Sequence, residues 1–101
     1  MACEYVLLPR AQEDFEEIVR YLSVELDSKR AAVRFVEEIE SKVLLACEYP
    51  EMHPLSQMPE VASRGYRVMP VMRYIVLYAY RDGRVVIAHI FHSLHDYARY
   101  V

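Results

Sequence analysis

The chain has few cysteines, no internal repeat and no excess of basic residues, and these absences exclude several classes of protein. Its two cysteines, Cys3 and Cys47, are far apart and form no Cys-x-x-Cys pair. This spacing argues against a zinc knuckle or a redox motif, and we expect two reduced thiols packed in the fold. We expect no cofactor.

A long apolar run is also absent. No stretch reaches the roughly 18 uninterrupted apolar residues of a membrane helix. Glu4 falls where a secretory signal would carry basic and then apolar residues. We therefore expect one domain over residues 1–101, located in the cytoplasm and without a membrane partner.

The net charge of −3 argues against a nucleic-acid-binding protein, but it averages two unlike halves. Residues 1–63 carry 6 Lys+Arg and 13 Asp+Glu, a balance of −7, whereas residues 64–101 carry 6 Arg and 2 Asp, a balance of +4. Two explanations stay open. The basic half contacts an anionic partner, or helix surfaces are simply rich in Glu and strands tipped with Arg.

The most informative stretch is residues 67–97, which holds three of the four histidines. Two β-rich runs, residues 73–80 and 84–92, flank Arg81-Asp82-Gly83. An Asp-Gly pair between apolar runs predicts a β-hairpin, because a primed turn needs positive φ angles.

Strand geometry predicts which residues of this hairpin share a face. In the first strand the two sets are Tyr74, Val76, Tyr78 and Tyr80, and Arg73, Ile75, Leu77 and Ala79; in the second they are Ile87, His89 and Phe91, and Val86, Ala88, Ile90 and His92. Both faces of the hairpin are therefore largely apolar. We expect helices on one face and, on the other, a partner from outside the chain.

The first half predicts a strand and two helices. Residues 3–8 form the strand, which Pro9 ends before starting a helix. Apolar residues then recur at helical spacing at Ala11, Phe15, Ile18, Val19, Leu22 and Leu26, and after a break at Ala32, Phe35, Val36, Ile39, Val43, Ala46 and Cys47. Acidic residues, Asp14 among them, fall outside the first stripe. Asp27 and Ser28 suit the cap of the second helix, which we expect to end near Tyr49.

Residues 49–64 contain three prolines and predict a surface crossover without helix or central strand. We expect Met52, Leu55 and Met58 to pack back onto the helices and His53 to be solvated. Residues 65–69 then begin a strand that Pro70 interrupts or ends.

The element order defines an α+β fold. It has an N-terminal strand and an antiparallel helical hairpin packed on one face of a mainly antiparallel four-stranded sheet. Residues 93–101 add a turn and a short C-terminal helix or a tail.

Three motifs in this order resemble the RelE/ParE superfamily of bacterial type II toxins. They are Tyr66-Arg67-Val68, Arg73-Tyr74-Ile75-Val76-Leu77-Tyr78 and Val86-Ile87-Ala88-His89-Ile90-Phe91-His92-Ser93-Leu94-His95-Asp96. Arg73-Tyr74 is similar to the entry of the third strand in the ParE-like branch. The end of the last motif is similar to its closing His-Gly-x-Arg-Asp signature, except that Ser93 replaces glycine and His95 replaces arginine.

The ParE-like resemblance implies a growth-inhibiting, plasmid-stabilising toxin that poisons DNA gyrase and is silenced by a cognate antitoxin in a hetero-oligomer. The residues expected to bind target or antitoxin are Arg67, Arg73, His92, His95 and Asp96. This toxin would act by binding and not by catalysis.

Resemblance to the RelE-like branch implies instead a ribosome-dependent, metal-independent endoribonuclease that activates a ribose 2′-hydroxyl of mRNA. Its catalytic residues would be His92, His95, Arg67, Arg73 and Tyr97, which are of the types that serve as base, donor and cations. Ile75 and Met69, however, stand where RelE-like nucleases tend to carry basic residues. A third alternative is a degenerate, non-toxic relative that only binds antitoxin.

The spacing of His89, His92 and His95 superficially suggests a metal site. Residues three apart on a strand face opposite ways, so we expect no metal. His89, on an apolar strand, is expected to be structural.

Overall fold

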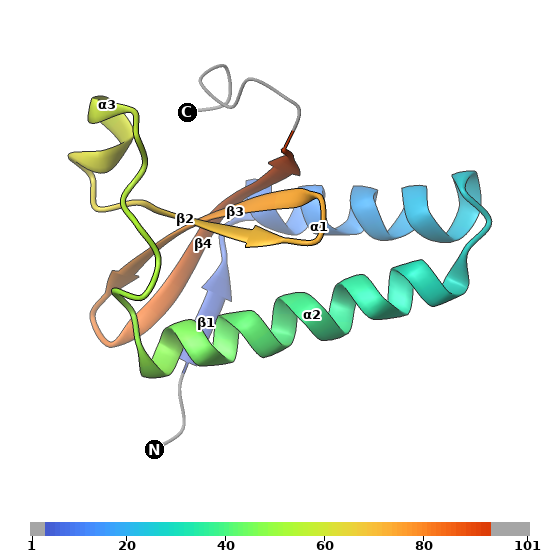
Figure 1. Ribbon diagram of the computed structural model, residues 1–101, viewed down its shortest axis with the longest axis horizontal. Coiled ribbons are helices and arrows are strands. Elements are labelled where there is room, and N and C mark those ends of the chain that lie inside the picture. Colours follow the sequence, from blue (N-terminus) through green and yellow to red (C-terminus); the bar gives the residue numbers. More distant parts are fainter. Residues whose placement is uncertain (1–3, 94–101) are drawn as a thin grey trace.

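The computed structural model describes residues 4–93 and shows a long helical hairpin beside a single sheet (Figure 1). The elements are β1 (Glu4–Leu7), α1 (Pro9–Arg20), the π-helical turn η1 (Tyr21–Glu25), α2 (Lys29–Glu48), α3 (Pro59–Ala62), β2 (Arg67–Val71), β3 (Tyr74–Arg81) and β4 (Arg84–His92). Among these helices none is long and apolar enough to cross a membrane. The expected C-terminal helix or tail lies outside the described residues, apart from Ser93 in the turn after β4.

The four strands form one mixed sheet in the order β1-β4-β3-β2. β1 runs parallel to β4, with Val6 opposite Val86, and the other two pairs are antiparallel. The predicted architecture of an N-terminal strand, a helical hairpin and a mainly antiparallel four-stranded sheet is therefore confirmed.

The β3–β4 hairpin turns at the predicted dipeptide. Asp82 has φ 53° and Gly83 has φ 77°, so both central residues of the two-residue loop are left-handed. This is the turn whose twist matches that of the flanking strands.

The helix boundaries also follow local signals. Pro9 lies in the first turn of α1, where its missing N–H costs nothing. The Ser28 hydroxyl accepts a hydrogen bond from the N–H of Ala31 at 3.1 Å and so caps α2. α2 ends at Glu48, one residue before the predicted end.

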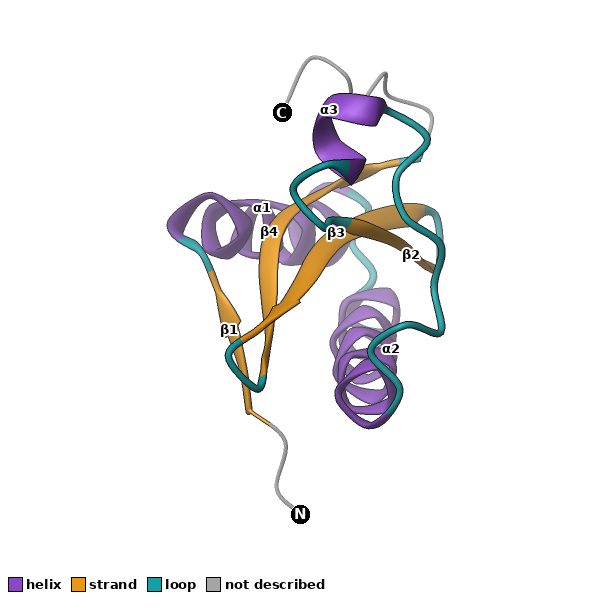
Figure 2. Ribbon diagram, turned by 90° about the vertical axis from the view of Figure 1, so that its left-hand side faces the viewer, coloured by secondary structure: helices purple, strands orange, loops and turns teal. Residues whose placement is uncertain are grey.

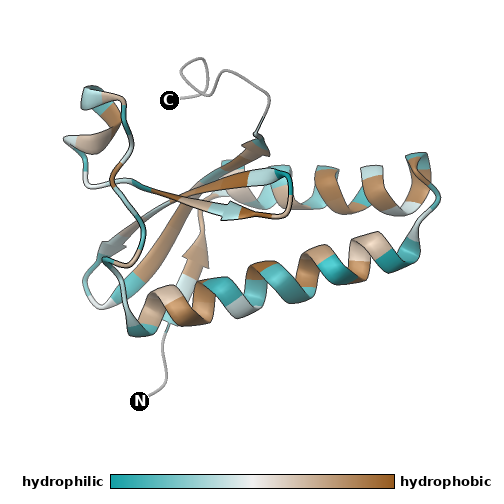
Figure 3. Ribbon diagram, in the orientation of Figure 1, coloured by the Kyte–Doolittle hydropathy of each residue, from teal (hydrophilic) through white to brown (hydrophobic). Residues whose placement is uncertain are grey.

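The main core lies between the helical hairpin and one face of the sheet. Figure 3 shows β3 and β4 as mostly apolar, whereas α2 is apolar along one side only. Its central residues are Phe35 of α2 and Tyr74 and Tyr78 of β3, and the Phe35 and Tyr74 rings meet edge to face with centroids 5.2 Å apart. The stripe predicted for α2 is buried in this core at every position except Val36, which is half-buried.

A β-bulge makes the predicted alternation of β4 wrong beyond Ile87. Tyr78 pairs with Ile87 but Leu77 pairs with His89, so Ala88 is an extra residue without a partner on β3. Ile87 and Ile90 consequently both lie in the helix-side core, although they are three residues apart.

The second face of the sheet is partly covered by the chain itself, which corrects the expectation that it awaits a partner. Figure 2 shows α3 on the opposite side of the sheet from α2. Val61 of α3 is buried with Leu77 and Phe91 in a second, smaller cluster.

The crossover also departs from its prediction. It contains a one-turn helix, α3, because Pro59 is well suited to a first helical turn. Met52 and Leu55 remain 46% and 44% exposed, and Met58 packs on the α3 side of the sheet and not on the helical hairpin.

Pro70 neither ends nor interrupts its strand. It lies inside β2, paired with Ile75, because β2 is an edge strand whose outward side needs no N–H donor there.

Cys47 is buried at the end of α2 and is disulfide-bonded, so the expectation of a reduced thiol is wrong at this position. Cys3 lies outside the described residues.

Tyr78 gives the first test of this packing. Its hydroxyl donates to the carbonyl of Pro50 at 3.0 Å, and burial raises its pKa above 10.0, although Arg67 and a backbone hydrogen bond from His53 oppose the rise. Since the unfolded chain ionises first, the stability due to neutral Tyr78 is fully present below about pH 10 and is lost as pH rises through the higher folded pKa.

We expect Tyr78→Phe to lower the free energy of unfolding at neutral pH by about 1 kcal/mol. The variant should also lose less stability than the wild type between about pH 9 and about pH 11, as measured by urea denaturation. Tyr80→Phe, at a 46% exposed position, is the control and should leave the free energy of unfolding at neutral pH nearly unchanged. Equal slopes for the wild type and Tyr78→Phe would contradict this account.

Candidate functional site: a groove between α1 and the β2–β3 turn

The described part of the chain contains a groove of about 720 Å³. One wall comes from α1 and η1, and the other comes from the β2–β3 turn and the end of β4. Its polar lining residues are Arg10, Asp14, Glu17, Arg73, His89 and His92. Tyr21, Leu26 and Met72 supply apolar surface and are 46%, 52% and 38% exposed.

The groove contains two of the predicted site residues, Arg73 and His92. Arg73 follows Met72, whose φ of 56° turns the chain sharply from β2 into β3. The Arg73 carbonyl accepts a hydrogen bond from the N–H of Ser93 at 2.8 Å, which ties the turn to the end of β4. The Arg73 turn and the end of β4, which are distant in sequence, are thus held together at one end of the sheet.

Tyr74 also lines this groove and is largely buried. It pairs in register with His92, and their rings meet edge to face with centroids 5.5 Å apart. Burial raises the Tyr74 pKa, nearby Tyr21 raises it further, and Arg73 opposes the rise. The phenol therefore stays protonated at neutral pH.

The back of the groove contains a buried hydrogen-bonded pair, Asp14 of α1 and His89 of β4. Asp14 is 6% exposed and His89 is 3% exposed, and Oδ2 of Asp14 contacts Nδ1 of His89. The same oxygen accepts a hydrogen bond from the backbone N–H of Ile90 at 3.0 Å, and Oδ1 lies 3.2 Å from Nε of Arg10. Both oxygens of the buried carboxylate are thus satisfied.

The position of Asp14 follows from where β1 ends. β1 covers the edge of β4 only as far as Ile87, and the N–H of Leu8 makes the last contact, with the Ile87 carbonyl at 2.9 Å. Beyond that point α1 replaces the strand, and the Asp14 side chain accepts the N–H that a strand would have accepted.

Sequence reasoning placed Asp14 outside the apolar stripe, and that was wrong. A signal was present, because Asp14 lies three residues after Ala11 and four before Ile18, on one face of a helix. The expectation that His89 is structural agrees with its burial and its bond to Asp14.

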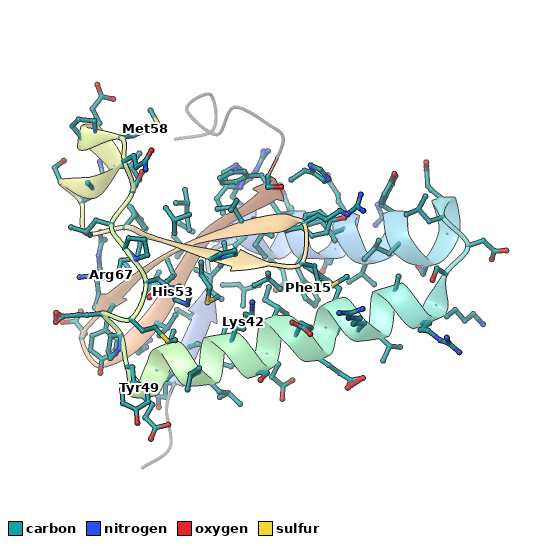
Figure 4. All side chains as sticks on the ribbon, viewed as in Figure 1. Phe15, Lys42, Tyr49, His53, Met58 and Arg67 are labelled. Carbon is teal, nitrogen blue, oxygen red and sulfur yellow. The ribbon has the colours of Figure 1, made fainter. Side chains whose placement is uncertain are left out.

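Arg67 is not part of the groove. It begins β2 and pairs with Tyr78, whereas Arg73 comes after the other end of this strand. At a rise of about 3.3 Å per residue, the two ends of β2 are about 13 Å apart. The Arg67 guanidinium donates to the His53 carbonyl at 2.7 Å, and Figure 4 shows both residues near the crossover.

His53 packs against Tyr78 and is half-buried, which corrects the expectation that it is solvated. Its ring is half-buried and meets the Tyr78 ring edge to face, with centroids 6.0 Å apart. Burial, and secondarily the charge of Lys42, lower its pKa. His53 is therefore neutral near pH 7.

The remaining predicted residues, His95, Asp96 and Tyr97, lie outside the described residues, and their roles stay predictions. Within residues 4–93 no group of three or more His, Cys, Asp or Glu side chains could hold a metal ion.

The helical hairpin and the mixed four-stranded sheet define a small α+β domain with a groove beside Arg73. The chain belongs to the family described as the ParE toxin of the type II toxin-antitoxin system parDE, whose model matches residues 5–97.

A solved structure is similar over most of its length. It is described as the chromosomal ParDE TA system from P. aeruginosa, and it superposes with a TM-score of 0.68 at 16% identity, covering 89% of this chain and 95% of that one. At this identity the likeness shows the fold alone. No curated protein matches the sequence.

The buried pair gives the second prediction. Asp14→Ala would leave His89 and the N–H of Ile90 without their shared acceptor, and a buried donor that loses its acceptor costs about 1–3 kcal/mol. We expect that loss in the free energy of unfolding, measured by urea denaturation. Glu13→Ala, at an exposed position of the same helix, is the control. A loss below about 1 kcal/mol for Asp14→Ala would mean that α1 is held by apolar packing alone.

Proposed function

We propose that the chain is a ParE-type toxin that inhibits growth by binding DNA gyrase, and that the groove between α1 and the β2–β3 turn takes part in this binding. The observation that carries the proposal is the convergence of Arg73 and His92 on one largely apolar groove. Family membership supports the toxin assignment, and the target is inferred from the ParE branch.

The groove also suits a segment of the cognate antitoxin. Exposed apolar side chains at Tyr21, Leu26 and Met72 match the apolar face of an amphipathic segment, and Arg73 suits an acidic side chain at its border. A segment disordered alone would fold on binding, as antitoxin segments of this kind do. Toxin and antitoxin would then form a hetero-oligomer in the cytoplasm, where gyrase acts.

Binding, and not RNA cleavage, is the activity that the groove supports better. Cleavage at a ribose 2′-hydroxyl needs a base, a donor and cations around one phosphate. Arg67, one of the two arginines expected to supply positive charge, is bonded to the His53 carbonyl and does not line the groove. The nuclease alternative is therefore the weaker one.

The test is to induce the chain without antitoxin and to measure growth, gyrase-dependent DNA breaks and mRNA cleavage on ribosomes in the same cultures. We expect growth arrest with DNA breaks and intact mRNA, and rescue by co-expressed antitoxin. Cleaved mRNA with intact DNA would establish the nuclease instead. Normal growth with a folded protein would identify a non-toxic relative.

The contribution of Arg73 can be separated from general effects of charge. We expect Arg73→Ala to weaken binding to purified gyrase by about 1–3 kcal/mol, roughly 5- to 150-fold in Kd, because truncation of an arginine that anchors an interface costs on this scale. Binding can be measured by biolayer interferometry.

Arg84→Ala is the matched control. Arg84 is an exposed arginine at the start of β4, paired with Glu4 at 3.6 Å, and it does not line the groove. Equal losses for the two variants would show that overall charge, and not the groove, sets the affinity for gyrase.

A further inference from the structure

The outer edge of β2 is closed to further strands. Val68 donates its N–H to the Pro54 carbonyl, and Ser56 donates to the Tyr66 carbonyl, both at 3.0 Å. Pro70 has no N–H, and its carbonyl accepts from Nζ of Lys42 at 2.9 Å. The crossover and α2 therefore occupy the positions that an added strand would use.

The exposed part of the β4 edge is closed as well. Beyond Ile87 its backbone faces α1, and Asp14 accepts the N–H of Ile90. Within residues 4–93 this leaves the outer edge of β1 as the one strand edge of the sheet to which no hydrogen bond is made.

The direction of the β1 backbone follows from its pairing. Leu8 donates to Ile87, and alternate residues of a strand direct their N–H and C=O groups to the same side, so Val6 and Glu4 face β4. Tyr5 and Leu7 therefore direct their backbone groups away from the sheet.

The side chains of this edge are apolar and accessible. Tyr5 is 41% exposed and Val6 is 37% exposed. The one charged residue in β1 is Glu4, and it is paired with Arg84 at 3.6 Å. β1 thus lacks the proline and the unpaired charge that commonly protect an edge strand.

We propose that β1 pairs antiparallel with β1 of a second copy of this chain. If the two-fold axis passes through Val6, Tyr5 of one copy lies opposite Leu7 of the other, and the outward N–H and C=O groups of both residues make four hydrogen bonds. The two four-stranded sheets then form one continuous eight-stranded sheet across an isologous interface.

A second copy fits this edge because the edge is self-complementary. In the two-fold register Val6 faces Val6, Tyr5 faces Leu7, and Glu4 faces Leu8, so that every cross-strand pair includes an apolar residue and no two like charges meet.

The negative charge of the surrounding surface opposes the same dimer. Residues 1–63, which include β1, carry a balance of −7, so two copies repel each other through their helices. Because salt screens this repulsion but leaves backbone pairing intact, the dimer should become tighter as ionic strength rises.

The experiment uses the purified chain without antitoxin, over concentrations of about 10 µM to about 1 mM, by sedimentation equilibrium. We expect a monomer–dimer equilibrium whose Kd falls when NaCl is raised. Val6→Lys and Val6→Glu should each raise the Kd by about tenfold or more, because each places two like charges opposite one another. An equimolar mixture of the two variants should dimerise again, because Lys then faces Glu.

Val33→Lys, at a 55% exposed position of α2, is the control and should dimerise like the wild type. Circular dichroism of every variant separates loss of pairing from loss of fold. Failure of the mixture to recover would overturn the Val6-centred register. A monomer at all concentrations, together with loss of antitoxin binding in Val6→Lys, would overturn the dimer and assign this edge to a strand of the antitoxin.

Discussion

One carboxylate, that of Asp14, connects the helical half of the chain to the sheet at the point where backbone pairing ends. β4 is longer than its neighbour β1, so part of its edge must find partners elsewhere. Asp14 accepts the N–H of Ile90 and contacts His89, which fixes α1 beside the strand end. The groove exists because α1 is held there, with one wall from the helix and the other from β4 and the β2–β3 turn.

Local chemistry in the sequence was sufficient to predict the elements. Asp82-Gly83 predicts its turn because few residues adopt positive φ, and Ser28 predicts a helix start because its hydroxyl can accept an N–H. What could not be predicted was the neighbour of each strand. Pro70 seemed to end a strand because nothing in the sequence identifies β2 as an edge, where a missing N–H is tolerated.

In the candidate site too, local motifs were predictable, whereas the spatial neighbours of a residue were not. Arg73 and His92 were predicted from motifs, and the register of β3 with β4 brings the ends of those motifs together. Arg67 was grouped with them by residue type, but a strand five residues long separates it from Arg73. Asp14 was missed because an acidic residue in an acidic helix is usually solvated; its spacing from Ala11 and Ile18 indicated the buried face, and the short β1 gives its carboxylate a backbone N–H to accept.

The unpaired Ala88 determines which face of the sheet each later residue of β4 occupies. Before it, Val85 and Ile87 face the helices; after it, Ile90 does so, and His92 lies against Tyr74 at the groove. If β4 continued as a regular strand through Ala88, His92, five residues after Ile87, would face the side covered by α3; the extra residue keeps it on the helix side. The bulge is therefore as much a part of the site as the side chains around it, and deletion of Ala88, which would leave Ile87 and Ile90 two residues apart, should keep both on the helix side of a regular strand.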